Sequence, residues 1–466
     1  MPLSTTLTLT DDVRMVVPDS IHLITPYVLM EQQDWFEDEI RFLRRLLQAG
    51  QKVIDIGANY GVYTLSMAKT VGPSGAVWAF EPASSTMALL AQGVAANGFL
   101  QVVLEGSALS SSSGSARLSL SDQSEMNALV RSEESAAHSE TVPLVTLDEC
   151  MQKYGWRDLA FMKIDAEGEE ANILKGGRRF FAELSPLIQY EVKAGAQLHL
   201  ELITAFEDLG YDSYRLVPGM DVLIPFDTTS MPDGYLLNLF CCKVDRAEML
   251  ADAGFLLTSV SHGSTTAPSV WDPLHATYGW RRSLAQLPYG TELAALWEQT
   301  MAQGVHAELE QALACYAISQ DRSLTAEQRF EGLDRSFGLF KTLCEGQPVS
   351  LRWASLARVA KDYGARAVAV AALDQLAQHL VEGKPINPGE PFLAPNSRFD
   401  SISIMGQGSN WVLASVLEEL ESLAAYSSFY SGESARQRLE MIRDLGLGSD
   451  EMQRRLNLLH RRFGAG

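Results

Sequence analysis

Between residues 52 and 243, short apolar runs rich in β-branched residues alternate with amphipathic stretches. The run at 52–57 (KVIDIG) is followed by apolar positions at helical spacing, and so is the run at 76–81 (AVWAFE). Repeated strand and helix units of this kind are typical of a mostly parallel sheet that is covered by helices on both faces. The pattern therefore predicts an α/β domain.

More apolar runs extend the predicted sheet. Further strands are expected at 101–104, 161–168 and 186–192. Alternating positions at 116–147 predict an insertion of short strands around a polar loop. Two closing strands, beginning at Tyr211 and Leu236, are joined by a turn rich in Pro and Gly, which indicates a terminal antiparallel pair. We expect seven strands, mostly parallel, with an antiparallel last strand.

Changes in pattern divide the chain into four parts. The expected parts are a helical or irregular segment at 1–45, the sheet domain at 46–245, a linker at 246–290 and an all-α region at 291–466. The linker is predicted because Ser, Thr, Gly, Pro and Trp replace periodic apolar positions there. In the last part, helical periodicity dominates.

Two similar helix endings in the all-α region indicate a weak repeat. Gly346 and Gly383 each follow an apolar helical pattern and lie 37 positions apart (383 − 346). This spacing is consistent with tetratricopeptide (TPR)-like helical hairpins. Because two units are few for a free-standing solenoid, the alternative is a small bundle or helices that pack on the sheet domain.

Length and charge narrow the class of protein. With 466 residues, of which 46% are hydrophobic, the chain is too long for one compact core and too apolar for disorder. Its formal net charge of −21 disfavours a nucleic-acid partner, which would be bound by clustered Lys and Arg. A neutral or cationic small molecule fits this charge better.

Cysteine usage and the N-terminal residues predict a location. The five cysteines form no CxxC pair and no zinc-type spacing, so we expect reduced thiols. Residues 1–14 contain no basic stretch followed by an apolar one, and no later stretch approaches the roughly twenty apolar residues of a membrane span. We expect a cytoplasmic protein without membrane contact.

The turn after the first strand carries the clearest candidate chemistry. In VIDIGANYG, at 53–61, Asp55 stands near the end of the strand, and small residues in the following turn let the backbone approach a ligand closely. A dinucleotide-binding turn would place backbone amides around phosphates, whereas an acid two positions before the first glycine repels phosphate. Asp55 instead favours a ligand with an ammonium and a sulfonium, such as S-adenosylmethionine. A nucleotide-dependent oxidoreductase is accordingly disfavoured.

A second acid supports this interpretation. Glu81 ends the second strand, in the sequence AFEP. A carboxylate there can accept hydrogen bonds from both hydroxyls of an adenosyl ribose. Asp55 and Glu81 together predict a positively charged, ribose-bearing donor.

Five motifs follow one another along the chain: DIGANYG from Asp55, FEP from Phe80, KIDAEGEE from Lys163, LKGG from Leu174 and QYEV from Gln189. These motifs and their order resemble those of the FkbM-type methyltransferases, over roughly 31–242. The resemblance implies a class I (Rossmann-like) methyltransferase fold and S-adenosylmethionine as the donor, with S-adenosylhomocysteine as product. It also implies O-methylation of a small molecule, natural product or sugar, as in natural product biosynthesis.

The resemblance also assigns site residues. It places the cofactor at Asp55, Gly57, Ala58, Asn59, Gly61, Glu81, Ser107, Ala108 and Asp165. Ser107 and Ala108, after the third strand, stand where this fold usually brackets the adenine. Asp165 and Glu167 stand at the carboxyl end of a central strand, the edge at which open α/β sheets bind ligands.

Methyl transfer to oxygen is an in-line displacement that depends on alignment and on removal of the hydroxyl proton. The candidate bases are Asp165, then Glu191, then Glu167. The three carboxylates could instead bind a divalent metal such as Mg²⁺, an alternative that we weigh lower.

Two roles remain open at this stage. The first is an enzyme that methylates a small-molecule or glycan acceptor. The second is a methyltransferase-like binding module whose helical tail recruits a protein partner. The apolar tail could also form a homodimer surface.

Overall fold

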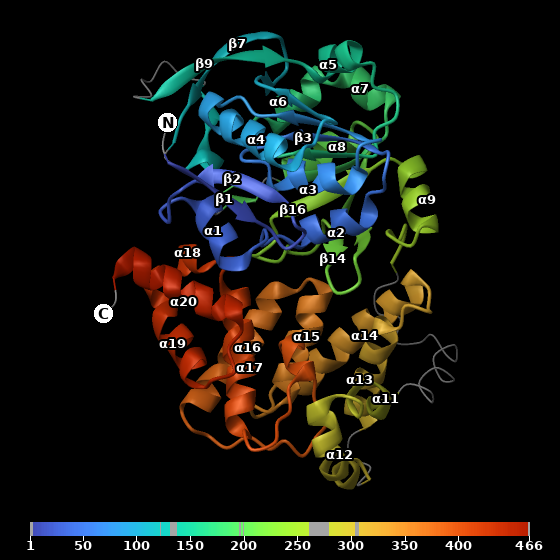
Figure 1. Ribbon diagram of the computed structural model, residues 1–466. Coiled ribbons are helices and arrows are strands. Elements are labelled where there is room, and N and C mark those ends of the chain that lie inside the picture. Colours follow the sequence, from blue (N-terminus) through green and yellow to red (C-terminus); the bar gives the residue numbers. More distant parts are fainter. Residues whose placement is uncertain are drawn as a thin grey trace. The chain divides into compact units, whose positions relative to one another are not determined.

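The computed structural model describes residues 3–121, 123–130, 138–194, 197–198, 200–260, 279–302 and 307–464. The chain divides into two compact units. The first consists of Met1–Leu216, Pro225–Asp227 and Leu236–Ala253, and the second of Val217–Ile224, Thr228–Tyr235 and Gly254–Gly466. In Figure 1 the first unit runs from blue to green, and most of the second runs from yellow to red.

A mixed sheet forms the centre of the fold, and all of its strands except the edge strand β15 (Val222–Pro225) lie mainly in the first unit. Its strands are, in order, β15, β14 (Asp212–Val217), β16 (Asn238–Cys242), β11 (Leu187–Glu191), β10 (Phe161–Ile164), β3 (Lys52–Ile56), β4 (Ala76–Phe80) and β5 (Val102–Glu105). The five strands from β11 to β5 are parallel, and β16 runs antiparallel to both β11 and β14. The described residues thus give eight strands, one more than expected, because β15 extends the edge beyond β14.

The strand order fixes where a ligand can bind. Numbered along the chain, the parallel strands β5, β4, β3, β10 and β11 are ordered 3-2-1-4-5, which is the doubly wound arrangement. The order reverses between β3 and β10, and the crevice outside the carboxyl ends of strands at such a reversal is where ligands bind. Asp55 of β3 stands beside Lys163 of β10 in the register of that pair.

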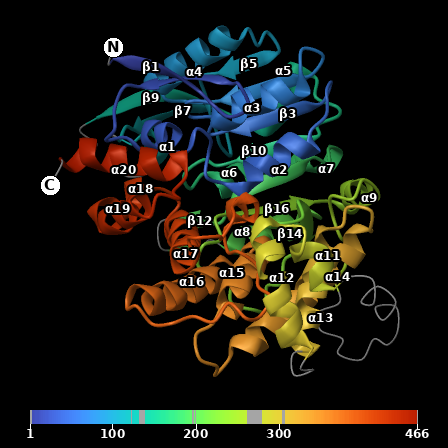
Figure 2. The same cartoon turned by 60° about the horizontal axis from the view of Figure 1, so that its bottom comes forward.

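Helices cover both faces of this sheet. Ile54, Ile56 and Ile164 belong to a core with α5 (Leu147–Tyr154), α6 (Glu170–Gly176), α7 (Arg178–Glu183) and α8 (Glu201–Glu207). On the other face, Ala79 packs with residues of α3 (Val62–Val71) and α4 (Ser84–Asn97). Figure 2 shows the sheet between these helices. The alternation of the strands therefore produces the α/β layers that the sequence predicts.

The N-terminal segment contains strands as well as helices. A hairpin of β1 (Ser4–Thr8) and β2 (Arg14–Pro18) precedes α1 (Ile24–Gln32) and α2 (Asp38–Leu46). Met15 and Val17 of β2 are buried in the core that includes Leu65 of α3. The expectation of a helical or irregular segment misses this hairpin, because β1 (STTLT) is mostly polar and no amphipathic helix separates it from β2.

The predicted insertion forms a separate four-stranded sheet. Its strands are β6 (Ala108–Leu109), β7 (Gly114–Ser119), β8 (Ala128–Leu129) and β9 (Ser139–Val145), with the 3-10 helix η1 (Ser124–Met126) between β7 and β8. Two short strands, β12 (Lys193–Ala194) and β13 (Gln197–Leu198), pair after β11, and α9 (Val244–Asp252) follows β16.

The second unit is mainly helical. Its elements are α11 (Trp280–Leu284), α12 (Pro288–Met301), α13 (Ala307–Gln320), α14 (Ala326–Cys344), α15 (Arg352–Tyr363), α16 (Arg366–Val381), η2 (Ser397–Ser401), α17 (Ser409–Ala424), α18 (Ser428–Ser431), η3 (Gly432–Ala435), α19 (Arg436–Asp444) and α20 (Asp450–Phe463). Successive helices from α13 to α17 pack on one another around a core that includes Trp280, Trp297 and Trp411. Gly346 and Gly383 follow the ends of α14 and α16 with φ values of 65° and 71°.

The segment at 246–290 that the sequence suggests as a linker contains helix. It includes most of α9, all of α11 and the start of α12. The central part of that segment, 261–278, lies outside the described residues. All five cysteines are free and buried. A search of the described helices finds none that combines the length and the apolarity required to cross a bilayer.

Candidate active site

A cavity lies at the carboxyl ends of β3, β4 and β10. Nine of the residues suggested by the sequence line it: Asp55, Gly57, Ala58, Asn59, Glu81, Ser107, Ala108, Asp165 and Glu167. Gly61 and Glu191 are not among the lining residues. The cavity also receives Trp35 and Glu37 from the N-terminal segment and Glu125 from the inserted sheet.

The turn after β3 brings the tips of β3 and β10 together. Gly57 has a φ of +79°, and a Cβ atom there would lie 1.7 Å from the carbonyl oxygen of Asp165. The N–H groups of Gly57 and Ala58 donate to the carbonyl of Phe80 at 3.1 and 3.0 Å. Because only glycine tolerates both this φ and this approach, Gly57 sets the width of the crevice.

Gly61 does not line the cavity, but it precedes α3, whose first residues do. It precedes α3 with a φ of +96°, and a Cβ atom there would lie 2.4 Å from Cδ1 of Leu90 in α4. Gly61 thus allows α3 to begin close to α4. This position sets the direction of α3 at the cavity.

Asp55 offers an unused acceptor. Its side chain is buried, and Thr64 Oγ1 donates to Asp55 Oδ2 at 2.5 Å. Within the described part of the chain, Asp55 Oδ1 is buried without a hydrogen-bond partner. Burial raises the pKa of Asp55, whereas the nearby Lys163 ammonium lowers it. An orphaned carboxylate oxygen at a cavity wall fits a ligand that brings a donor or a positive charge.

Glu81 is held by two backbone donors. The N–H of Asn59 donates to Oε2 at 2.9 Å, and the N–H of Ala83 donates to Oε1 at 2.8 Å. Burial raises the pKa of Glu81 to about 7, although these two hydrogen bonds oppose the change. Each carboxylate oxygen has a second lone pair, so Glu81 can still accept two hydroxyl donors. Asp55 and Glu81 therefore face one cavity.

Residues after β5 close another side of this cavity. Ser107 is buried, and its Oγ has no hydrogen-bond partner among the described residues. Ala108 beside it is also buried. Ser124 Oγ of η1 donates to Asn59 Oδ1 at 3.0 Å, which ties the inserted sheet to the turn after β3. The orphaned atoms of Ser107 and Asp55 both fit a polar ligand in the cavity.

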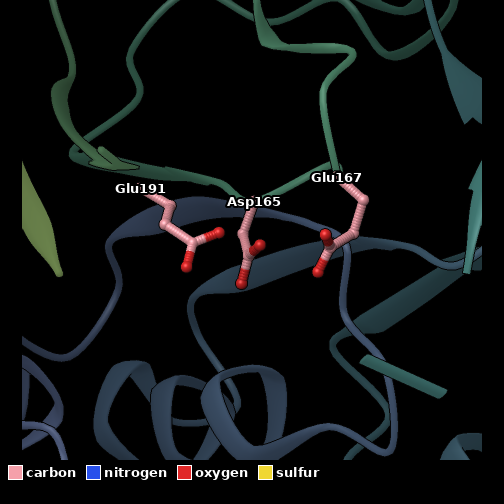
Figure 3. A group of neighbouring side chains, drawn as sticks. All are labelled: Asp165, Glu167 and Glu191. Carbon is pink, nitrogen blue, oxygen red and sulfur yellow. The ribbon is translucent and has the colours of Figure 1, made fainter. Parts of the chain in front are cut away.

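Three carboxyl groups converge at the sheet edge. Asp165 follows β10, Glu167 lies two residues later, and Glu191 ends β11. One carboxylate oxygen from each lies within 4.8 Å of the others. Figure 3 shows Asp165 between the two glutamates, with all three side chains pointing to the same side of the sheet edge.

The crowding of these acids changes their protonation. Desolvation, followed by the charges of Asp165 and Glu167, raises the pKa of Glu191 to about 9. Glu167 is exposed as a residue, yet desolvation of its carboxyl and the charges of Asp165 and Glu170 raise its pKa to about 7. Glu191 therefore holds a proton at neutral pH, and Glu167 is close to its midpoint.

The sequence interpretation missed Lys163 as a site residue. Its side chain is only 7% exposed, and its Nζ donates to Asp165 Oδ2 at 2.6 Å. A lysine within the otherwise apolar strand FMKI was the available signal, since a central parallel strand is buried on both faces. Glu37, Tyr63 and Thr64, which also surround Lys163 or Asp55, carry no such signal.

The acid cluster has the oxygen ligands that a divalent cation prefers. One oxygen of its central member, Asp165, already accepts from the Lys163 ammonium. The cluster consequently offers fewer free oxygens to a metal than the count of carboxylates suggests. The geometry fits a proton-handling cluster better.

Comparison with known proteins gives one family match and remote structural similarities. Residues 55–213 match the model described as the methyltransferase FkbM domain. No curated protein matches the chain.

Among solved structures, the chain is similar to methyltransferases. An FkbM methyltransferase from Methylobacillus flagellatus KT is 16% identical with a TM-score of 0.29, over 42% of this chain and 44% of that one. An S-adenosylmethionine-dependent O-methyltransferase from Thermotoga maritima is 15% identical with a TM-score of 0.27, over 50% and 74%. A putative methyltransferase from Streptococcus mutans, in complex with SAH, is 10% identical with a TM-score of 0.27, over 44% and 96%. The chain thus spans less than half the length of the Methylobacillus protein.

Proposed function

Because residues 55–213 form an FkbM methyltransferase domain, which is S-adenosylmethionine-dependent, we propose that this protein transfers a methyl group to a hydroxyl of a small molecule, natural product or sugar. The observation that carries the proposal is the shared cavity of Asp55 and Glu81, with Asp165 at its edge. Two acids at successive parallel strand ends favour a positively charged, ribose-bearing donor over a phosphate-bearing one.

The residues of the cavity fit this donor. Glu81 accepts the two ribose hydroxyls, and the free Oδ1 of Asp55 attracts the positive end of the ligand. Ser107 Oγ supplies a hydrogen bond beside the adenine. When bound, S-adenosylmethionine supplies a methyl group activated by a sulfonium.

Asp165 is proposed as the base for the acceptor hydroxyl. Its Oδ2 is fixed by Lys163, which leaves Oδ1 to take the hydroxyl proton of the acceptor. Glu191, which holds its proton at neutral pH and belongs to the same acid cluster, is proposed as a hydrogen-bond donor beside Asp165. Glu167 is the second candidate base, because its pKa of about 7 allows it to exchange protons near neutrality.

The acceptor is proposed to be neutral or cationic. Within the described part of the chain, the cavity is lined by five Glu or Asp side chains in addition to Asp55 and Glu81 (Glu37, Glu125, Asp165, Glu167 and Glu169), and by one lysine. An anionic acceptor would meet uncompensated repulsion there. Acceptors that donate several hydrogen bonds, such as polyols and sugars, suit these carboxylates.

Calorimetry and a labelling assay test the proposal together. We expect S-adenosylmethionine to bind the purified protein, and a methyl-labelled donor to transfer its label to one component of a mixed small-molecule extract. A donor concentration of about 1 mM is high enough to detect binding weaker than that of most cofactors. The absence of binding up to this concentration would exclude the proposal.

Replacing Asp165 with Asn separates the enzyme from a binding module. An enzyme of this design keeps the donor but loses label transfer, since Asn cannot accept the hydroxyl proton. A module that recruits a protein through its helical tail would show no transfer with either form. The matched control is Glu183→Gln, which makes the same carboxylate-to-amide change at an exposed position of α7.

A further inference from the structure

Lys163 is the one basic side chain among the described residues that line the cavity. It comes from the middle of β10, where Phe161, Met162 and Ile164 are fully buried. Lys163 itself is buried, and such a charge is retained only when partners compensate its lost hydration. The groups that contact Lys163 therefore indicate its role in the cavity.

The strand register places Lys163 in a polar row across the sheet. Asp55 of β3 is its neighbour on one side and Gln189 of β11 on the other. All three side chains are buried, and neighbours in register point to the same face. The row runs from the cofactor side of the cavity to the strand that ends in Glu191.

One strong contact directs the ammonium toward the catalytic edge. Lys163 Nζ lies 2.6 Å from Asp165 Oδ2 and 4.9 Å from the ring centroid of Tyr63. The Oδ2 atom of Asp165 therefore pairs with a buried cation, while the Asp165 side chain as a whole remains 35% exposed at the opening of the cavity. Such a contact fixes the orientation of a carboxylate that is otherwise free to rotate.

The N-terminal segment holds the other side of Lys163. Glu37 accepts a hydrogen bond from Tyr63 Oη, and Gln189 Nε2 donates to the same Oη at 3.1 Å. Burial would lower the pKa of Lys163, but Asp165, Asp55 and Glu37 together raise it above the ordinary value. Glu37 lies outside the FkbM match at 55–213, so the segment before the matched domain contributes to the site.

We propose that Lys163 is a positioning residue, which holds the Asp165 carboxylate in the orientation that takes the acceptor proton. Glu37, Tyr63 and Gln189 keep its ammonium at the base of the cavity. The role rests on the proposed function, because it presupposes that Asp165 meets an acceptor hydroxyl. It differs from a purely structural charge, since the loss of label transfer on its removal is expected to require Asp165.

Three variants test this role: Lys163→Met, Lys163→Arg and the double variant Lys163→Met with Asp165→Asn. Lys163→Met is expected to lower the rate of label transfer by about a hundredfold, the effect of a misplacement near 1 Å. It should weaken S-adenosylmethionine binding by a smaller factor, because loss of the ammonium also raises the pKa of the neighbouring Asp55. Lys163→Arg, which keeps a cation, is expected to recover part of the rate. The double variant should be no slower than Asp165→Asn alone.

The control is Lys153→Met. Lys153 also forms a 2.6 Å ion pair, with Glu105, but it is 57% exposed and does not line the cavity. It should leave both transfer and binding unchanged. Thermal unfolding of each variant shows whether the fold survives, and Lys163→Gln replaces Lys163→Met where the latter is unfolded at the assay temperature.

A second measurement does not depend on turnover. Crystals of wild type and Lys163→Met grown with S-adenosylhomocysteine should contain the same ligand in the same place, with the Asp165 carboxylate rotated away only in the variant. Equal transfer rates, additive losses in the double variant, or an unmoved Asp165 would each overturn the role of Lys163. Failure of the wild type to bind S-adenosylmethionine would instead overturn the proposed function.

Discussion

At the scale of single residues, burial decides what the carboxyl groups of the cavity do. Glu81 and Glu191 both have raised pKa values, mainly through desolvation. They differ in their partners, because Glu81 accepts two backbone hydrogen bonds whereas Glu191 stands beside two other acids. Just above neutral pH, Glu81 is therefore a carboxylate that can accept hydrogen bonds from the hydroxyls of a ligand, while Glu191 keeps its proton.

The pKa of Glu81 predicts how donor binding varies with pH. Affinity for S-adenosylmethionine should rise between about pH 6 and pH 8, because ribose hydroxyls bond more strongly to the carboxylate than to the acid. Glu81→Gln should weaken binding by about 10- to 100-fold, the equivalent of one charged hydrogen bond, and should remove this pH step. Calorimetry across the pH range measures both effects.

Glu105→Gln is the matched control for Glu81. Glu105 ends the neighbouring strand β5 but does not line the cavity, and its carboxylate pairs with Lys153. The control should keep the wild-type affinity and pH step. A pH step that survives in Glu81→Gln would assign the titration to another acid.

Gly57 gives a stability prediction at the same scale. Gly57→Ala introduces a Cβ atom 1.7 Å from the Asp165 carbonyl and an unfavourable φ, whereas Gly98→Ala has a similar φ of +68° and no atom within 4 Å. Gly98→Ala should cost about 1–2 kcal/mol of unfolding free energy from its backbone conformation. Gly57→Ala should cost a further 1–3 kcal/mol or so from overpacking, measured by urea denaturation. Equal losses would mean that the strand tips are not in tight contact.

The residues at strand ends could be predicted from the sequence, and most buried partners could not. Asp55, Glu81 and Asp165 follow apolar strand runs, so the parallel topology alone brings them to one edge. Glu37 and Tyr63 reach Lys163 only through the packing of the N-terminal segment and α3, which no local pattern specifies. Their contribution depends on tertiary contacts between positions distant in sequence.

At the scale of elements, strands were predictable where apolar runs alternate with amphipathic helices, and not where this alternation is absent. The strands that alternate with helices at 52–104 and 161–191 lie where the apolar runs indicate. The β1–β2 hairpin was missed, and β15 extends the sheet past the expected seven strands. Strand length does not explain these misses, since the predicted strands β3, β4 and β11 also have five residues. β1 (STTLT) is mostly polar, and β15 lies in the stretch between the two closing strands that the pattern assigns to a turn.

Two helices begin with the same N-terminal capping box, so the contribution of the cap to stability can be measured at two places in the chain. Thr146 caps α5 in the first unit and Thr325 caps α14 in the second, each with a complete capping box. Thr146→Ala and Thr325→Ala should each cost about 1 kcal/mol through loss of one cap. Calorimetric unfolding of each variant measures the loss. An unchanged unfolding free energy in either variant would show that its capping box does not stabilise the helix.

At the scale of the whole molecule, the acid cluster sets a pH dependence of stability. The pKa of Glu191 is raised from 4.5 to about 9 in the folded protein, so the folded state holds a proton that the unfolded state has released. The unfolding free energy should therefore fall as pH rises from about 4.5 to 9, by at most about 1.4 kcal/mol per pH unit from this group.

Glu191→Gln mimics the protonated form and should flatten this dependence. Urea denaturation of wild type and variant between pH 5 and 9 gives the difference in slope. Glu183→Gln, at an exposed position that pairs with Arg179 and lies outside the acid cluster, should keep the wild-type slope over this pH range. A variant that follows the wild-type curve would show that Glu191 is ionised in the folded protein at neutral pH.

A crystal structure of the protein with S-adenosylhomocysteine tests the central claim most directly. The account predicts that the ribose hydroxyls lie within hydrogen-bond distance of the Glu81 carboxylate, with the ligand's amino acid end beside Asp55 and its sulfur facing the Asp165 edge. Density for the ligand outside this cavity, or a ribose that contacts neither carboxylate, would contradict the assignment.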